Sequence, residues 1–207
     1  MRCAWILVLA AGCVAPVYDS PNDYLDLELG RSWVYSIHAE GMRRLELTTK
    51  LLGSDLRSLP DEDRVVFMQL YGRIEPDGPD LTKSMYAMSS SGPREFVFNT
   101  WAWSMQHEPP IPLVPTKNTT SEPVEWEGVL VYRKKRYETT ARVRLAGEEV
   151  KQTPLGALRC VKVVTTYAAG DIEITRWFAS GVGLVEVRVV AVAGDAGAKL
   201  LSTTEPS

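Results

Sequence analysis

Residues 171–192 read DIEITRWFASGVGLVEVRVVAV and predict two strands joined by a tight turn. In the second half, valines alternate with charged residues, which is typical of a strand with one buried and one wet face. The valines are Val185, Val187 and Val189, and the charged residues are Glu186 and Arg188. Residues 180–183 include two glycines, which accept the positive φ of a tight turn. We therefore expect antiparallel strands at 171–179 and 183–192.

The same period of two recurs along most of the chain from Gly30 onward, and turn-forming residues separate the runs. No long window carries the 3.6-residue stripe of an amphipathic helix. Besides the two strands above, we expect strands near 31–38, 42–52, 64–75, 82–89, 94–101, 126–133, 137–149 and 157–168. The predicted fold is all-β: a single curved antiparallel sheet that forms a half-barrel or a partly closed barrel.

Five prolines interrupt the pattern between Glu108 and Pro123. Proline removes a ladder donor, so we expect this stretch not to be a central strand but to cross over between two groups of strands. We interpret it as a connection inside one domain, with a split into two domains as the alternative. A single domain of this length has enough residues for a sizeable core.

The N-terminus carries a positive Arg2, a short apolar stretch from Ala4 to Ala11, and the run Leu9-Ala10-Ala11-Gly12-Cys13. This run resembles the lipobox of bacterial lipoproteins, in which the cysteine thiol receives a diacylglycerol and the chain is cut before the cysteine. The apolar stretch is too short to span a bilayer. The alternatives are an ordinary secretory signal and a buried N-terminal strand.

The lipobox resemblance implies a division of the chain into a signal peptide (1–12), a lipidated tether (13–23) and a β-sheet domain (24–207). It also implies that Cys13 carries the acyl groups, including palmitate, that hold the protein on the membrane. Val14 follows the cysteine, and a residue other than Asp there favours export to the outer membrane, facing the periplasm.

Composition and charge narrow the classes of partner. A formal net charge of −3 gives no electrostatic reason to expect nucleic acid. The basic run at 133–136 is either a patch for anionic groups or a solvated hairpin turn. If Cys13 is alkylated and Cys3 leaves with the signal, Cys160 has no disulfide partner, and we expect a small buried hydrophobic residue there.

Two further segments resemble a broad group of bacterial envelope proteins of unknown function. Leu29 to Tyr35, LGRSWVY, is similar to the opening "L-x-x-G-x-x-W-x-Y" strand of the group, and residues 145–190 follow its later motifs in order and spacing. Ser180 stands where the group usually has proline. The resemblance implies a curved antiparallel sheet, in some members similar to the half-barrels with which periplasmic lipoprotein carriers shield acyl chains. It implies no catalytic residues.

Residues for enzyme chemistry are sparse. The two histidines, His38 and His107, lie in different predicted elements, and no nucleophile elbow or phosphate-binding loop occurs. We expect no enzyme, no metal site and no cofactor. A cluster of either histidine with carboxylates in one pocket would favour the enzyme alternative.

The best candidate for a binding surface is the aromatic stretch before the proline-rich segment. Trp101, Trp103 and Met105 share one strand face and form either the mouth of a groove for an acyl chain or apolar peptide, or plain core. We expect a membrane-anchored envelope lipoprotein that binds a hydrophobic or lipid-modified ligand in the concave face of the sheet. The alternatives are a structural or assembly subunit of an envelope protein complex, and an enzyme.

Overall fold

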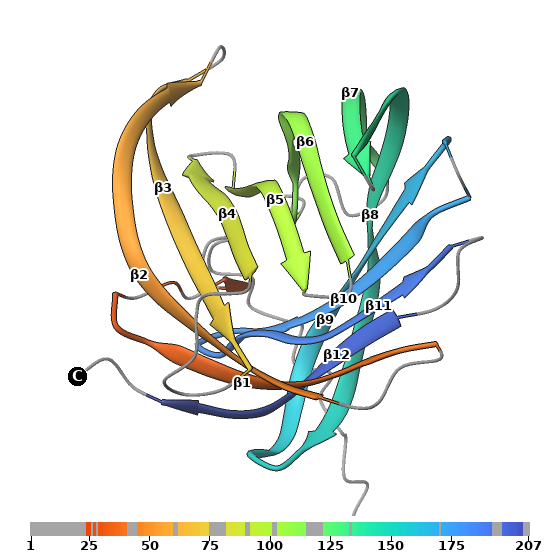
Figure 1. The fold of residues 1–207 in the computed structure, drawn as a ribbon. Helices are drawn as coiled ribbons and strands as arrows, with labels where there is room; N and C mark the ends of the chain where they lie inside the picture. The colour runs from red at the N-terminus through yellow and green to blue at the C-terminus, as the bar shows by residue number, and fades with distance from the viewer. Residues whose placement is uncertain are drawn as a thin grey trace, which may run out of the picture.

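A computed structural model describes residues 24–25, 27, 29–40, 45–59, 62–74, 82–89, 92–100, 103–114, 122–132, 134–169, 171–191 and 196–204. The described residues form twelve strands (Figure 1). They are β1 (Ser32–Ala39), β2 (Leu45–Leu59), β3 (Glu62–Arg73), β4 (Thr82–Ser89), β5 (Gly92–Thr100), β6 (Trp103–Pro112), β7 (Val124–Tyr132), β8 (Lys135–Thr153), β9 (Gly156–Tyr167), β10 (Glu173–Ala179), β11 (Gly183–Val190) and β12 (Ala196–Thr204).

The strands form one antiparallel sheet in which each strand pairs with the next along the chain. The last strand, β12, pairs with β1 and closes the sheet into a barrel, with Ser32 opposite Thr204. The prediction of a single curved antiparallel sheet is confirmed. Two of its strands, β6 and β12, were not predicted as strands, and β12 is the one that completes the closure.

The proline-rich stretch begins inside the sheet, so the prediction that it lies outside a central strand is wrong for its first part. Strand β6 runs on to Pro112 between β5 and β7, but its pairing with β7 ends at Glu108. On the other side, the register with β5 shifts between Glu95 and Val97. The prolines are tolerated because they follow the last ladder pair with β7.

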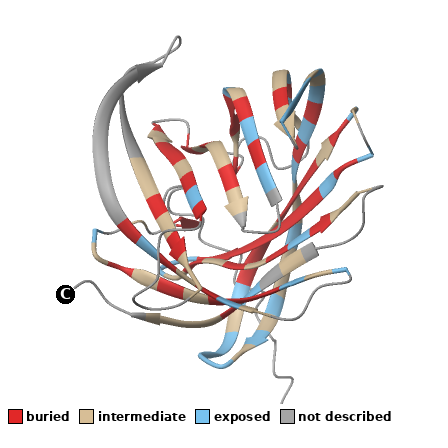
Figure 2. Ribbon diagram, in the orientation of Figure 1, coloured by how far each residue is buried: buried red, intermediate tan, exposed pale blue. Residues whose placement is uncertain are grey.

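The interior of the barrel is filled by one large apolar cluster contributed by nearly every strand. Figure 2 shows the buried residues as red bands that recur along the strands. The largest fully buried apolar side chains are Trp33, Phe178, Leu51, Met105, Ile111, Leu113, Leu130 and Ile174. Alternation of inward and outward residues therefore does what the sequence predicted: it puts one face of each strand in a common core.

A second, smaller apolar cluster lies on the outer face, around Cys160, Trp177, Ala179 and Val185. It is covered by β8, whose Lys151 Nζ lies 3.7 Å from the centroid of the Trp177 ring. Cys160 is fully buried, as expected from the sequence. Burial raises the pKa of its thiol to about 11, so the thiol stays protonated.

Strands β8 and β9 run past their neighbours as a two-stranded arm (residues 144–160), at the bottom of Figure 1. The pairing of β7 with β8 stops at Val143, and that of β10 with β9 starts at Val161. A register shift between Leu145 and Glu148 bends β8 where the arm begins, and Gly147 there has a φ of 103°. Most side chains at the tip of the arm are exposed (Figure 2).

Candidate functional site

The start of β1 is tied to the turn between β10 and β11 by three side chains that alternate along the strand. Arg31 Nη2 donates to the Gly181 carbonyl at 2.8 Å, Trp33 Nε1 to the Val182 carbonyl at 2.8 Å, and the Tyr35 hydroxyl to the Leu184 carbonyl at 3.0 Å. Both ends of these bonds lie in the segments that carry the envelope-protein resemblance, 29–35 and 145–190. Their motifs therefore meet in one structural unit at one end of the barrel.

An apolar cavity of about 60 Å³ lies inside this end of the barrel. Leu25 and Leu27 border it from the segment that precedes β1, and Leu184 borders it from β11. The remaining lining is mostly apolar and includes Trp33, Tyr35, Leu47, Leu70, Tyr86, Phe98 and Val187. The polar residues at the cavity are Thr49, Ser84 and Asn99.

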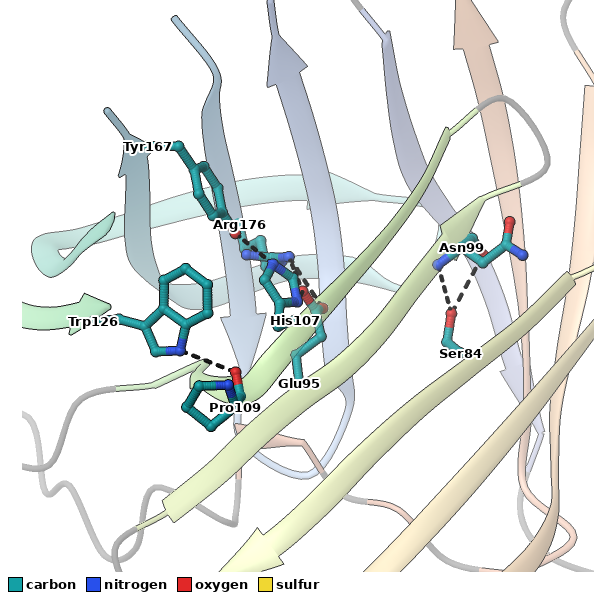
Figure 3. Close-up of polar contacts among 8 residues, drawn as sticks. All are labelled: Ser84, Glu95, Asn99, His107, Pro109, Trp126, Tyr167 and Arg176. Carbon is teal, nitrogen blue, oxygen red and sulfur yellow. Dashed lines mark hydrogen bonds and ion pairs between the residues drawn. The ribbon is translucent and has the colours of Figure 1, made fainter. Parts of the chain in front are cut away.

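Two of those polar residues are already engaged with each other. Ser84 Oγ accepts a hydrogen bond from the Asn99 backbone N–H at 3.0 Å and lies 3.3 Å from the Asn99 carbonyl (Figure 3). The Tyr35 hydroxyl also has its partner in the Leu184 carbonyl. The cavity therefore favours an apolar guest, since most of its lining is apolar and the Ser84 and Tyr35 hydroxyls are already bonded.

Deeper in the interior, Arg176 of β10 and Glu95 of β5 form a buried ion pair (Figure 3). A single guanidinium nitrogen, Nη2, donates to both carboxylate oxygens, at 2.8 and 3.0 Å. Both side chains are almost completely shielded from solvent. Burial raises the pKa of Glu95, while the charge and hydrogen bonds of Arg176 oppose that rise.

His107 of β6 lies beside this pair. Its Nε2 is 2.7 Å from the Tyr167 hydroxyl, and its Nδ1, which has no hydrogen-bond partner among the described residues, is 3.8 Å from Glu95 Oε1. Burial, with the charge of Arg176, lowers the pKa of His107 to about 3, so the ring is neutral at pH 7. A carboxylate beside Nδ1 favours the tautomer that carries its proton there, with the Tyr167 hydroxyl donating to Nε2.

Aromatic rings enclose the imidazole of His107. The Tyr167 ring stacks on it with centroids 5.9 Å apart, and the Trp126 ring stands edge-on at 5.7 Å. Trp126 Nε1 donates to the Pro109 carbonyl at 3.0 Å, which fixes the indole (Figure 3). The Arg176 guanidinium carbon lies 5.0 Å from the centroid of Phe98. Burial also raises the pKa of Tyr167, so its hydroxyl remains protonated.

The histidine and carboxylate thus come together, but in packed core and not at the described cavity. Glu95 is held by Arg176, and none of these three side chains borders the apolar cavity. Such a group can order the core and specify the inward positions of β5, β6 and β10. All of its members are buried.

Only some of the predicted site residues are described by the structure. Cys13 and Trp101 lie outside the described residues, and for Trp103 only the backbone, at the start of β6, is described. Met105 is fully buried in the interior cluster and does not border the cavity. His38 is exposed on β1, whereas His107 is buried beside Glu95, so the two histidines do not share a cluster.

Sequence reasoning missed Arg176 and Glu95. Arg176 shares the parity of Ile174 and Phe178, so a charge on an apolar face was a usable signal of a buried partner. Glu95 gave no such signal, because the register shift after it puts Glu95 and Phe98 on the same inward face despite their odd spacing.

Among the described residues, no group of three or more histidine, cysteine, aspartate or glutamate side chains is placed to hold a metal ion. Within the same ranges, no helix has the length and apolar character to cross a bilayer.

Comparison with known proteins identifies the fold. No family model and no curated protein matches the chain. A solved structure of a candidate exported protein with a YmcC-like fold, from Bacteroides fragilis, aligns with a TM-score of 0.54 and 12% identity, over 88% of this chain and 99% of that one. This likeness shows that the two chains share a fold. A candidate lipoprotein from Parabacteroides distasonis aligns with a TM-score of 0.48 and 12% identity, over 87% of this chain and 98% of that one.

Proposed function

We propose that this chain is a lipid-anchored, non-enzymatic protein of the bacterial envelope whose barrel holds a small apolar ligand. The lipobox-like run ending at Cys13 supports the anchor, and Val14 supports outer-membrane export with the barrel in the periplasm. The shared fold with a candidate exported protein is consistent with a place outside the cytoplasm.

The single observation behind the ligand site is the apolar cavity at the end of the barrel where the chain enters. Its volume of about 60 Å³ is well below the 300–1,000 Å³ of ordinary ligand pockets. The guest is therefore narrow, such as the end of one acyl chain, and a whole lipid does not fit. Leu25 and Leu27 border the cavity, so a guest there contacts the segment that continues into the proposed tether.

The test uses the full-length protein extracted from membranes. Native mass spectrometry, with lipid extraction, looks for a co-purifying acyl species, and calorimetry measures binding of octanoate. Leu184→Phe fills the cavity and should abolish binding, because Leu184 borders it. Leu158→Phe, in the outer cluster, is the matched control and should bind as the parent does. Equal binding by both variants, or no bound species in the parent, would contradict the ligand site.

A structural or assembly role is the second candidate, and one observation favours it. Closure of the barrel pairs every described strand with two neighbours, which removes most free edges. The exceptions include residues 52–59 of β2, which have no described partner on the side away from β3, and residues 144–153 of β8 in the arm, which have none on the side away from β9. A partner strand could add there. Site-specific photocrosslinking from position 150 in intact cells tests this role, and a defined protein adduct would support it.

A further inference from the structure

The described residues include three large apolar side chains that are exposed to solvent: Leu29 at 55%, Val150 at 63% and Leu155 at 42%. Single exposed leucines are common on protein surfaces, so their number carries no weight. Their location in the fold is informative. Leu29 precedes β1, while Val150 and Leu155 belong to the arm, and all three lie at the end where the chain enters the barrel.

Two observations bring these segments together. A groove of about 340 Å³ is lined by Tyr24, by arm residues that include Glu148 and Arg159, and by Ala179 and Ser180 at the end of β10. The hydrogen bond from Arg31 to the Gly181 carbonyl holds the start of β1, two residues after Leu29, against the turn that follows β10.

The arm is braced against the barrel wall. Lys151 of the arm pairs with Glu186 of β11 at 3.1 Å, and Trp177 Nε1 of β10 donates to Glu149 of the arm at 2.9 Å. Lys162 also donates to Glu149 at 2.9 Å. These contacts fix the direction in which the tip, with Leu155, projects from the barrel.

The position of the anchor decides which surface this end meets. Cys13 precedes Tyr24 by eleven residues, and an extended chain spans at most about 3.6 Å per residue, so the anchor keeps Tyr24 within about 40 Å of the bilayer. Tyr24 and Leu25 are buried against the barrel, which makes their end the attached end. The arm has three basic side chains, Arg144, Lys151 and Arg159, and two acidic ones, Glu148 and Glu149. The segment 24–31 has two acidic residues, Asp26 and Glu28, and one basic residue, Arg31, so the two segments together carry no formal net charge and charge neither favours nor opposes contact with a bilayer.

We infer that the arm and the segment before β1 rest on the lipid bilayer, with Leu155, Val150 and Leu29 dipping into its interfacial region. This inference rests on the proposed lipid anchor and adds an orientation to it. The barrel then stands on the membrane with the turns at its other end, such as that between β9 and β10, directed away from the lipid.

The test places one environment-sensitive fluorophore on the full-length lipidated protein in vesicles of phosphatidylethanolamine and phosphatidylglycerol. Leu155→Cys, in a Cys160→Ala background, carries the label at the arm tip. Ala168→Cys is the matched control, because Ala168 is exposed in the turn at the other end of β9. The expected result is a blue-shifted emission, quenched several-fold by a lipid-borne quencher, at position 155 only.

The outcomes separate this inference from the anchor on which it rests. If the protein fails to float with the vesicles, the lipid anchor itself is wrong. If it floats but the label at 155 remains as aqueous as that at 168, only the orientation is wrong. A label at 155 that is shielded in cell membranes and aqueous in pure lipid vesicles shows a protein partner at the arm, and this result also overturns the inference.

Discussion

Trp33 and Val182 are 149 positions apart in the chain, and the indole N–H of the first donates to the carbonyl of the second at 2.8 Å. In the barrel, β12 lies between β1 and β11. The bond therefore reaches past β12, from the first strand to the turn between β10 and β11. Tyr35 and Arg31 make equivalent bonds on either side. Three donors on one face of β1 thus reinforce the part of the barrel that pairs the two ends of the sheet.

Tyr35→Phe should destabilise the barrel by about 1 kcal/mol, since it deletes the hydroxyl that bonds the Leu184 carbonyl and leaves the ring in place. Trp33→Phe should cost about 2–4 kcal/mol, because it also removes buried ring area. Urea unfolding followed by circular dichroism measures both. The prediction concerns which variant loses more stability. A larger loss of unfolding free energy in Tyr35→Phe than in Trp33→Phe would contradict the packing role of Trp33.

Glu95→Gln should cost about 3–5 kcal/mol, because it leaves the Arg176 guanidinium buried without its counter-charge. The double variant Glu95→Leu with Arg176→Met should fall within about 1 kcal/mol of the parent, or be more stable, since apolar side chains of similar volume suit this core. The double variant and the single variants Glu95→Leu and Arg176→Met form a double-mutant cycle with the parent, which chemical denaturation measures. Additive losses in the cycle would show that the two side chains do not interact.

Acid should weaken the fold through His107. The pKa of His107 is about 3 in the folded chain and about 6.5 when unfolded, so between those pH values the unfolded state binds more protons and stability falls as the pH falls. From pH 7 to pH 5 this amounts to about 2 kcal/mol. Denaturant midpoints at several pH values measure it.

His107→Gln is the control for the acid prediction, because its amide keeps a partner for Tyr167 and does not titrate. Glu95 and Arg176 face the same ring. The raised pKa of Glu95 acts with the opposite sign, but it is present in both proteins and largely cancels in the comparison. Equal pH dependence in the two proteins would rule out His107 as the acid-sensitive group.

Gly128→Ala should cost about 1–3 kcal/mol by overpacking. A methyl group there would lie 2.4 Å from the Glu108 carbonyl oxygen and 2.7 Å from Trp126 Cζ2, so backbone or indole must move. The indole N–H resonance of Trp126 should shift as its bond to Pro109 is disturbed. Gly181→Ala meets open space and only the strain of a φ of 70°, so it should leave that resonance unchanged.

Period-two alternation and turn residues together located ten of the twelve strands of one antiparallel sheet, although β10 is buried on both faces along most of its length. Alternation could not predict that the sheet closes into a barrel. Strand β12 begins with small residues, Ala196-Gly197-Ala198, that give no alternation. Its place is set by contacts, since an added methyl at Gly197 would lie 2.8 Å from both His38 Cε1 and the Val187 carbonyl oxygen.

The candidate site was less predictable, because bulges move side chains from one face to the other. A register shift beside Phe178 puts Leu184 at the interior cavity and Val185 in the outer cluster, although simple alternation places Val185 with Val187. The pairing of His107 with Glu95 likewise depends on how β5 and β6 shift against each other. The spacing of residues along the sequence does not show where such register shifts occur.

Closure by β1 and β12 has a kinetic consequence. The hydrogen bond from Thr203 to the Ser32 carbonyl joins residues 171 positions apart, whereas every other strand pair is adjacent in sequence. Because loop-closure entropy disfavours this pairing most, we expect it to form last, from an open ribbon with two unpaired edges. A holding chaperone that shields those edges until β1 pairs with β12 would raise the yield of folded protein.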